Sequence, residues 1–219
     1  MGKVVAIDGP SGAGKSTLAK SLAEVLGFEY LDTGALYRAI ALSLKFKGIA
    51  PEDDDKKIAR ALEGVSIEFR DGRVYLNGND VSEDIRTKEA GHYSSVFSAR
   101  KPVRDFLLPL QRGFSRGDKD LVVEGRDMTT VVFPDAWKKF YLDASTRERA
   151  RRRYEQMAIL RKNISMEDAI EDVELRDKRD SSREIAPLKR SDDAFYLDTT
   201  DMTASQVLDK MIEVINEVF

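Results

Sequence analysis

The sequence predicts an α/β fold in which helices cover both faces of a five-stranded parallel sheet. Five short apolar runs alternate with segments of helical periodicity, and this alternation is typical of parallel strands joined by crossover helices. The runs are residues 4–8, 28–31, 121–123, 140–142 and 195–197. Such a fold has three layers, and its functional residues lie in the loops that follow the carboxyl ends of the strands.

Two helices can be placed from apolar periodicity. Between the first two strands, Leu18, Leu22 and Val25 recur on one face of residues 15–26, and Gly27 follows as a helix-ending residue. A last helix is predicted after residue 203 from four apolar residues at helical spacing: Val207, Met211, Ile215 and Val218.

Residues 65–85 interrupt the alternation of strands and helices. Residues 66–70 and 73–77 alternate in polarity as strands do, and Asp71-Gly72 between them is predicted to be a hairpin turn. A second turn is predicted at residues 77–79. We interpret the segment as a small antiparallel insertion on the substrate side of the molecule. The alternative is a surface loop without a role in function, because insertions in loops cost little free energy.

Residues 9–16 read Gly-Pro-Ser-Gly-Ala-Gly-Lys-Ser and fit the pattern G-x-x-x-x-G-K-[ST] between the first strand and the first helix. The glycines let the backbone wrap around a polyphosphate, and the helix that starts at Lys15 adds its positive end. Lys15 would reach the β- and γ-phosphates, and the Ser16 hydroxyl would hold Mg²⁺. The alternative is a glycine-rich turn with an unrelated lysine, which would not explain the flanking strand and helix. The motif therefore predicts a nucleoside triphosphate site.

Charged residues also follow the second and third strands, where the binding crevice of the sheet should open. Asp32-Thr33 would cap the next helix, and Arg38 within that helix would either reach an anionic substrate or lie on the surface. After the third strand, Arg126 suits a phosphate and Asp127 a polar base or sugar group, with a solvated turn as the alternative.

Arginine is concentrated in two stretches. Residues 146–153 contain five arginines, and Arg176, Asp180 and Arg183 follow at a spacing that would place them on one helix face. An ion-paired surface stripe is the ordinary explanation for such charges. Because the chain as a whole is net acidic, we favour a lid whose arginines close over phosphates.

Composition limits the function classes. The 219 residues are 42% hydrophobic and 34% charged, which is typical of a soluble globular protein with its own core. A net charge of −3 argues against a nucleic-acid partner, and the absence of cysteine excludes disulfides, thiolate catalysis and cysteine-based zinc sites. No stretch approaches the roughly 20 apolar residues of a membrane span, and the start is too short and acidic for a signal peptide. We therefore expect a cytoplasmic protein without a membrane partner.

The only histidine, His92, lies outside these motifs. An acceptor that must lose a proton would want a nearby base, whereas a phosphate monoester is mostly dianionic already near neutral pH. Aspartate or glutamate could serve another acceptor, so this observation favours a phosphate acceptor without deciding it.

Together these motifs resemble the bacterial cytidylate kinases of the nucleoside monophosphate kinase family. The resemblance runs from Val4 to the final helix and is carried by five segments: IDGPSGAGKST (7–17), LDTGALYR (31–38), GRDMTTVVFPDA (125–136), residues 141–153 and residues 176–188. It implies a P-loop fold with three layers, a monophosphate-binding insertion and an arginine-rich helical lid. It also implies transfer of phosphate from ATP to CMP or dCMP with Mg²⁺.

The resemblance also implies site residues. It assigns the whole loop to ATP: Gly9, Pro10, Ser11, Gly12, Ala13, Gly14, Lys15, Ser16 and Thr17. It assigns nine residues to CMP: Thr33, Arg38, Ser95, Arg104, Arg126, Asp127, Arg176, Asp180 and Arg183. Of these, Ser95, Arg104 and Asp127 would meet the cytosine. Arg38 and Arg126 would meet the phosphate, and Arg176 and Asp180 the sugar. The catalytic positive charges would be those of Lys15, Arg126, Arg183, Arg149 and Arg153. Arg152 resembles a further lid arginine.

Two positions depart from the family pattern. Thr33 stands where serine is common, which keeps the hydroxyl and adds a methyl group. Met128-Thr129-Thr130 stands where Met-Gly-Thr is commoner, so the loop after Asp127 is expected to be stiffer. Neither change removes a required group.

We expect one monomeric P-loop kinase domain. Its core would comprise residues 1–38, 86–147 and 185–219, with the insertion at 39–85 and the lid at 148–184. The alternatives are a small P-loop kinase for UMP, AMP or a hydroxylated metabolite, a GTPase switch, and an ATP-dependent nucleic-acid-binding protein. The guanine-reading Asn-Lys-x-Asp pattern of a GTPase is missing, and the net charge argues against the last alternative.

Overall fold

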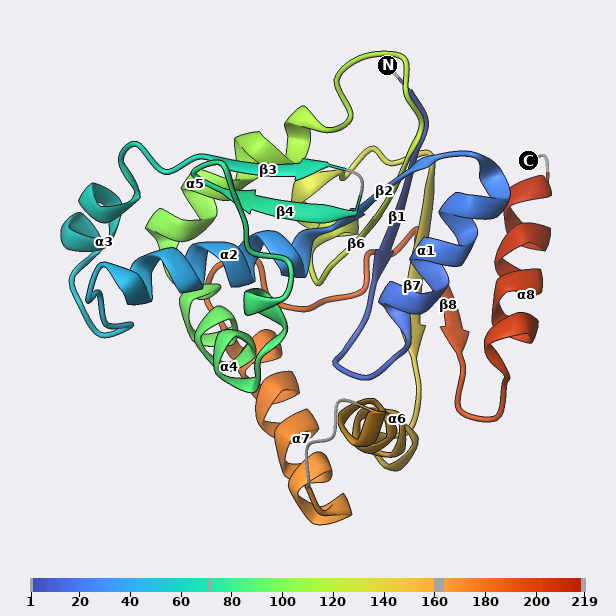
Figure 1. Ribbon diagram of the computed structural model, residues 1–219. Coiled ribbons are helices and arrows are strands. Elements are labelled where there is room, and N and C mark those ends of the chain that lie inside the picture. The colour runs from blue at the N-terminus through green and yellow to red at the C-terminus, as the bar shows by residue number, and fades with distance from the viewer. Residues whose placement is uncertain (1, 71, 160–163, 218–219) are drawn as a thin grey trace.

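The five predicted apolar runs form one parallel sheet in the computed structural model, which describes residues 2–70, 72–159 and 164–217. The order across the sheet is β2-β6-β1-β7-β8 (Figure 1). The strands are β1 (Val4–Asp8), β2 (Glu29–Asp32), β6 (Leu121–Glu124), β7 (Lys138–Asp143) and β8 (Phe195–Asp198). The predicted fold class is confirmed, and the strand ends differ from the prediction by at most two residues.

β1 and β6 lie at the centre of the sheet, and every residue of both strands is buried. Helices cover both faces of a parallel sheet, so central strands are apolar on both sides. Val4 of β1 faces one apolar core, whereas Val5 faces another. Because the two strands run parallel and in register, their last residues, Asp8 and Glu124, place two carboxylates at the same edge of the sheet.

Helices form the two outer layers. α1 (Lys15–Leu26) and α8 (Ala204–Asn216) pack on one face, and α2 (Thr33–Phe46) and α5 (Lys101–Gly113) cover the other (Figure 1). This sandwich buries an apolar stripe of each helix, which is why the periodicity of α1 and α8 could be read from the sequence.

Caps set the helix ends. α1 has the predicted bounds because Gly14 before it and Gly27 after it both adopt left-handed backbone conformations. α8 begins after Thr203, whose side chain forms a reciprocal capping box with Gln206. Val218, which was predicted to extend the apolar stripe of α8, lies outside the described residues.

The predicted insertion forms an antiparallel sheet of β3 (Ile67–Arg70), β4 (Arg73–Leu76) and β5 (Asn79–Asp80). Asn77 and Gly78, with φ of 50° and 82°, make the turn between β4 and β5. Asp71, predicted for the first turn, lies outside the described residues. α3 (Asp55–Leu62) precedes this sheet, and a short helical turn (Asp84–Arg86) and α4 (Lys88–Phe97) follow it.

The small sheet rests on α2. Figure 1 shows β4 beside α2, and Val74 of β4 belongs to the same apolar core as Leu36 and Ile40 of α2. The predicted boundary between core and insertion at residue 38 therefore falls inside a continuous helix. The division into core, insertion and lid stays a prediction.

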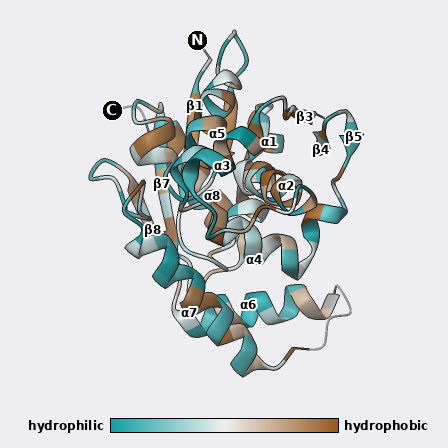
Figure 2. Ribbon diagram, turned by 90° about the vertical axis from the view of Figure 1, so that its left-hand side faces the viewer, coloured by the Kyte–Doolittle hydropathy of each residue, from teal (hydrophilic) through white to brown (hydrophobic). Residues whose placement is uncertain are grey.

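α6 (Thr146–Ile159) and α7 (Met166–Ser182) form a helical pair that Figure 2 shows set apart from the sheet. Residues 160–163 of the predicted lid lie outside the described residues. α7 ends at Ser182, and Arg183 has an extended backbone with ψ of 140°. The prediction that Arg183 shares a helix face with Arg176 and Asp180 is therefore wrong: Arg183 follows the helix.

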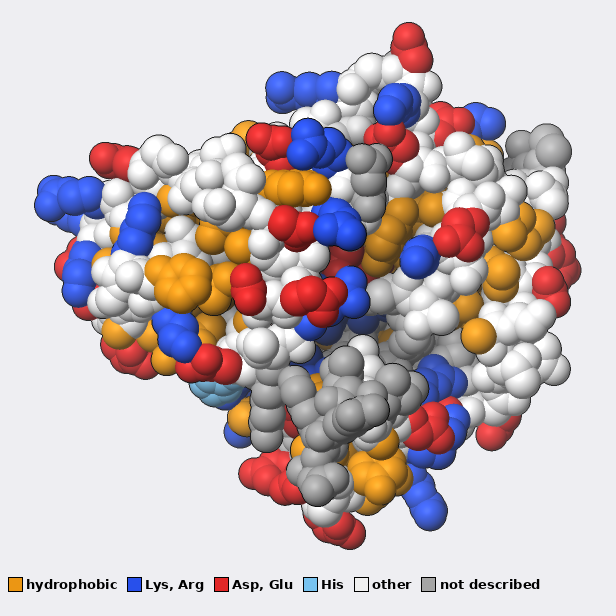
Figure 3. Space-filling model, viewed as in Figure 1, with side chains coloured by type: hydrophobic (Ala, Val, Ile, Leu, Met, Phe, Trp, Pro, Cys, Tyr) orange, Lys and Arg blue, Asp and Glu red, His pale blue; other side chains and the backbone are white. Residues whose placement is uncertain are grey.

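Acidic and basic side chains are interspersed over the face shown in Figure 3. Across the described ranges, no helix combines the length and apolarity needed to cross a bilayer. Charged side chains also line a cavity at the carboxyl ends of the sheet strands.

Candidate active site

A cavity of about 690 Å³ opens at the carboxyl ends of β1 and β6, facing α6 and α7. The fold brings predicted site residues from separate motifs to its wall: Ser11, Gly12, Gly14, Lys15, Ser16, Thr17, Thr33, Arg38, Ser95, Arg126, Asp127, Arg152, Arg153, Arg176, Asp180 and Arg183. Five other predicted residues are not among the described residues that line it: Gly9, Pro10, Ala13, Arg104 and Arg149.

The phosphate-binding loop needs its glycines for close approach as well as for conformation. Gly9 has φ of 150°, and a Cβ there would collide with the Leu142 carbonyl oxygen of the neighbouring strand. Gly14 has φ of 86° and directs the chain into α1. The first N–H groups of α1 have no partner within the helix, so they and its positive end are available to an anion in the cavity.

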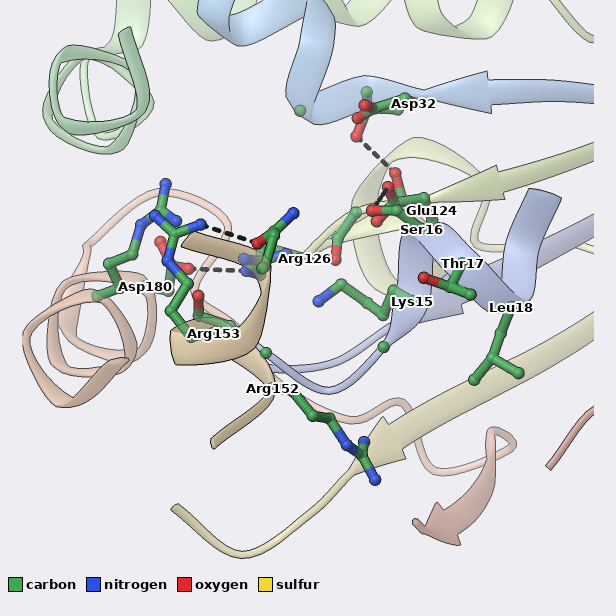
Figure 4. Close-up of a pocket in the computed structure, with 18 of the residues that line it drawn as sticks. Lys15, Ser16, Thr17, Leu18, Asp32, Glu124, Arg126, Arg152, Arg153 and Asp180 are labelled. Atoms are coloured by element: carbon green, nitrogen blue, oxygen red, sulfur yellow. Dashed lines mark hydrogen bonds and ion pairs between the residues drawn. The ribbon is translucent and has the colours of Figure 1, made fainter. Parts of the chain in front are cut away.

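Lys15 lies at the floor of the cavity and extends toward Arg126 (Figure 4). Its Nζ donates a hydrogen bond of 2.7 Å to the Pro10 carbonyl oxygen. Burial and the neighbouring charge of Arg126 lower the pKa of Lys15 to about 7. A polyphosphate in the cavity would oppose both effects, because it would supply negative charge beside the amine.

Oxygen donors gather on the other side of Lys15 (Figure 4). The Ser16 hydroxyl donates a hydrogen bond of 2.6 Å to Glu124 Oε1. Burial and the nearby Asp32 carboxylate raise the pKa of Glu124. In the described part of the chain, no three histidine, cysteine or carboxylate side chains group as a metal site of their own. Ser16 beside two carboxylates fits Mg²⁺, which takes oxygen ligands and is commonly shared between few protein groups and phosphates.

Thr33 and Arg38 reach the cavity from the start of α2. Asp32 caps this helix by accepting a hydrogen bond of 2.9 Å from the Ala35 N–H, as predicted. The second oxygen of Asp32 pairs with Arg38 at 2.9 Å. The Thr33 hydroxyl donates to the Glu124 backbone carbonyl at 2.7 Å, so α2 is fixed to the end of β6.

Ser95 and Asp127 both line the cavity, and Arg104 lies next to Asp127. Arg104 pairs with the Asp127 carboxylate and donates a bond of 3.0 Å to the Ser98 carbonyl, so it lies behind Asp127 and fixes it. Ser95 is buried on α4, and its hydroxyl has no hydrogen-bond partner among the described residues. A buried hydroxyl without a partner is costly, so a polar ligand here would gain from meeting it.

Arg126 and Asp180 form the ion pair drawn in Figure 4, with Nε and Oδ2 2.8 Å apart. Burial works against the Arg126 charge, but Asp180 and Glu124 outweigh it and raise the pKa of this arginine. Burial likewise opposes ionisation of Asp180, yet Arg126 and Arg183 keep the pKa of this carboxyl low. Burial and Arg126 lower the pKa of Arg176 to about 10. Arg126 therefore keeps its positive charge despite its burial.

The arginines of α6 point in different directions. Arg153 lines the cavity and pairs with Asp172 at 3.1 Å. Arg152 lies beyond the phosphate-binding loop and donates a bond of 2.6 Å to the Thr199 carbonyl (Figure 4). Arg149 is buried, and its guanidinium is occupied by the Ser11 and Ala144 carbonyls and by Asp177. The three therefore do not act as one group.

The family model described as cytidylate kinase matches residues 5–217. The chain belongs to the cytidylate kinase family. A cytidylate kinase from Thermodesulfovibrio yellowstonii is 55% identical, with 99% of each chain covered. One from Thermotoga neapolitana is 46% identical, with 99% of this chain and 98% of the other covered. An uncharacterized protein from Eubacterium ventriosum shares the fold alone, with a TM-score of 0.56 at 13% identity over 99% of each chain.

In this member of the cytidylate kinase family, one end of the cavity was missed by sequence reasoning. Besides Arg152, residues just before and within α8 line the wall beyond the phosphate-binding loop: Thr199, Met202, Thr203, Ala204 and Val207. Arg152 Nη1 donates to the Thr199 hydroxyl at 2.9 Å, which fixes the guanidinium against this wall. Thr199 directly follows β8, and this place after a strand could have pointed to it in the sequence. That its partner is Arg152 of α6 is visible only in the fold.

Sequence reasoning also missed two carboxylates, Asp8 and Glu124, although both end central strands. Asp8 is fully buried and accepts hydrogen bonds from the Met128 and Thr129 N–H groups at 2.9 and 2.7 Å, and from the Thr129 hydroxyl at 2.7 Å. It therefore ties the end of β1 to the segment after Asp127. Burial outweighs these bonds and raises the pKa of Asp8 to about 6.

Replacing Thr129 with valine should lower the free energy of unfolding by about 1–2 kcal/mol at about pH 7.5, because a hydroxyl bond to a buried carboxylate is lost. The pKa of Asp8 is higher in the folded protein than its ordinary value of 3.8, so protonation of Asp8 stabilises the folded state. This stabilisation is present at low pH and is lost as the pH rises from 3.8 to about 6. The loss should therefore be smaller at about pH 5, where Asp8 is mostly protonated in the folded state. Denaturant unfolding at both pH values measures it.

Thr130→Val is the matched control. The Thr130 hydroxyl is buried without a hydrogen-bond partner among the described residues, so its removal should leave stability unchanged or raise it. Equal losses for the two variants would contradict the assigned role of the Thr129 hydroxyl.

Proposed function

We propose that this chain transfers the γ-phosphoryl group of ATP directly to the phosphate of CMP or dCMP, giving CDP or dCDP. The observation that carries the proposal is one cavity lined by cationic residues from separate elements, in a member of the cytidylate kinase family. Lys15 belongs to the phosphate-binding loop, and Arg126, Arg183 and Arg38 come from the segments after β6 and α7 and from α2. Two phosphate groups could thus meet head to tail between fixed positive charges.

We assign the loop from Gly9 to Thr17 to the ATP phosphates, and the wall formed by Arg152, Thr199 and Val207 to the rest of that nucleotide. Arg152 is already held by Thr199, so it offers a fixed guanidinium face, and Val207 offers apolar surface. Such a wall suits a flat base. Ser16, with Glu124 and Asp32 near it, would hold Mg²⁺, which neutralises phosphate charge when bound.

We assign the opposite end to CMP. The Ser95 hydroxyl, which has no hydrogen-bond partner in the described ranges, and the Asp127 carboxylate, which Arg104 fixes from behind, can read the polar edge of cytosine. We assign Asp180 and Arg176 on α7 to the sugar, and Arg126 and Arg38 to the phosphate, since all four line the cavity. Thr33 borders the same end through its bond to the Glu124 carbonyl.

In the proposed reaction, catalysis depends on the position of the two phosphate groups and on the positive charge of the side chains around them. A phosphate oxygen of CMP is already charged near neutral pH, so no residue must remove a proton from it. His92 is exposed on α4 and takes no part. Lys15, Arg126, Arg183 and Arg153 would stabilise the charge that spreads over the transferring group. Insertion and lid would close over both nucleotides, which keeps water from accepting the phosphoryl group.

The test is a product assay that offers CMP, dCMP, UMP, AMP and a hydroxylated metabolite in turn with ATP and Mg²⁺. CMP and dCMP should be phosphorylated with much higher kcat/KM than the others. The Lys15→Ala protein, purified in the same way, corrects for contaminating kinases. Faster turnover of AMP or of the metabolite would overturn the proposal. We place the reaction in the cytoplasm. We also expect the protein to be a monomer, and sedimentation measures its oligomeric state.

A further inference from the structure

We infer that Arg149 and Asp177 are positioning residues that hold the phosphate-binding loop through hydrogen bonds with the backbone N–H and carbonyl oxygen of Ser11. The inference deepens the proposed function, on which it rests, by assigning Arg149 a role other than contact with phosphate. It comes from a closed ring of contacts among three residues that lie far apart in the sequence.

The ring has three links. Asp177 Oδ1 of α7 accepts a hydrogen bond of 3.1 Å from the Ser11 N–H. Arg149 Nη1 of α6 donates one of 3.0 Å to the Ser11 carbonyl oxygen. The same Nη1 pairs with Asp177 Oδ2, which closes the ring. One loop residue is therefore held at its donor and at its acceptor, so rotation of either flanking peptide would break a charge-assisted bond.

Arg149 is itself immobilised. Its Nε donates to the Ala144 carbonyl at 2.9 Å, and its side chain is only 8% exposed. Asp143 adds a second acidic neighbour at 3.8 Å from Nε. A guanidinium with these partners has little freedom to swing toward a phosphate, and it is not among the described residues that line the cavity. This placement favours support of the loop over contact with the transferring group.

The backbone of α6 also touches the loop. Gly12 has φ of 79°, and a Cβ there would lie 2.6 Å from the Arg149 carbonyl oxygen. Only glycine allows α6 to come this close. Figure 1 shows α6 directly beneath the loop. The start of α6 and the middle of α7 are thus fixed to the loop at Ser11 and Gly12. Closure over phosphates falls to residues further along α6, such as Arg153.

The consequence is a loop whose shape is set before ATP arrives. The N–H groups after Ser11 must converge to meet a phosphate, and an unsupported glycine-rich segment would lose much backbone entropy on binding. Asp177 satisfies the Ser11 N–H, which leaves the later N–H groups for the ligand. Loss of the ring should therefore weaken binding of the ATP side and spare CMP binding.

The experiment compares Asp177→Asn, Arg149→Lys and the double variant with the wild-type enzyme. Each single variant should raise the KM for ATP and the Kd for ADP about tenfold, with the KM for CMP changed by less than about twofold. Because the ring is broken by either change, the double variant should be no worse than about twofold beyond the singles. Unchanged ADP binding, equal increases in both KM values, or additive effects would each overturn the inference.

Arg100→Lys is the matched control. Arg100 also donates to a backbone carbonyl and to a carboxylate: the Asp53 carbonyl at 2.7 Å and the Asp55 carboxylate at 2.6 Å. These contacts lie beside α3, away from the loop. This variant should lose stability without a change in ADP binding. A loop variant that behaves in the same way would show a merely structural role and so contradict the inference.

Amide hydrogen exchange on the nucleotide-free wild-type enzyme tests the same point without any variant. The Ser11 amide should be protected, because its acceptor belongs to the protein. An unprotected Ser11 amide would overturn the inference. ADP calorimetry and amide exchange do not depend on which monophosphate is the acceptor, so the inference and the proposed function can fail separately.

Discussion

Replacing Lys15 with alanine should lower kcat/KM for CMP phosphorylation by about a hundredfold or more, which corresponds to ~3 kcal/mol of transition-state stabilisation. Its Nζ donates a hydrogen bond to the Pro10 carbonyl, and the amine is buried at the floor of the cavity, close to where the phosphates would lie. Charge grows on the transferring group in the transition state, so the loss should fall mainly on kcat. Steady-state kinetics with both substrates varied measures the split.

The lowered pKa of Lys15 gives a second measurement on the same variant. With a pKa of about 7, the free amine is largely neutral at about pH 8, and an adjacent polyphosphate would raise that pKa. ATP binding by the wild-type enzyme should therefore take up a proton at this pH. Calorimetry in two buffers of different ionisation enthalpy measures the uptake, which Lys15→Ala should abolish.

Lys20→Ala is the control for Lys15, since Lys20 is exposed on the same helix and is not among the residues lining the cavity. It should keep activity within about twofold of wild type. A Lys15→Ala enzyme that kept half its activity would refute the assigned role.

The fold could be read from the sequence where local patterns and tertiary structure agree. β1 and β6 are buried on both faces, so they stand out as continuous apolar runs, and α1 is bounded by two glycines with left-handed backbone. The small antiparallel sheet could be predicted because its strands alternate in polarity around turns such as Asn77-Gly78. These features depend on residues close together in the chain.

Parts of the site depend on distant residues and could not be read in this way. Nothing near Arg149 in the sequence indicates that its partners are Ser11 and Asp177, so it was grouped with the neighbouring lid arginines. Periodicity placed Arg183 on α7, but the helix ends one residue earlier. Charge patterns show that a residue is polar, but which partner it meets is decided by the packing of α6 and α7 against the sheet.

Replacing Arg126 with alanine should also lower kcat/KM by about a hundredfold or more. Arg126 follows β6 at the centre of the sheet and lies between Lys15 and Asp180, where the two phosphate groups would meet (Figure 4). Asp180 and Glu124 keep its pKa high despite burial, so its charge is permanent over the working pH range. Unlike Lys15, it should affect CMP binding as well as kcat, because it would hold the acceptor phosphate before transfer.

Two further variants separate this role from a structural one. Arg126→Lys keeps a positive charge but loses the planar donor set, so we expect partial recovery of kcat and poor recovery of the KM for CMP. Arg116→Ala, an exposed arginine after α5, should have little effect. Arg126→Ala also leaves Asp180 without its closest partner, although Arg183 still lies 3.9 Å from that carboxylate. If thermal unfolding shows a folded Arg126→Ala enzyme with unchanged kcat/KM, the phosphate must be held by other groups and the assigned arrangement of the cavity is wrong.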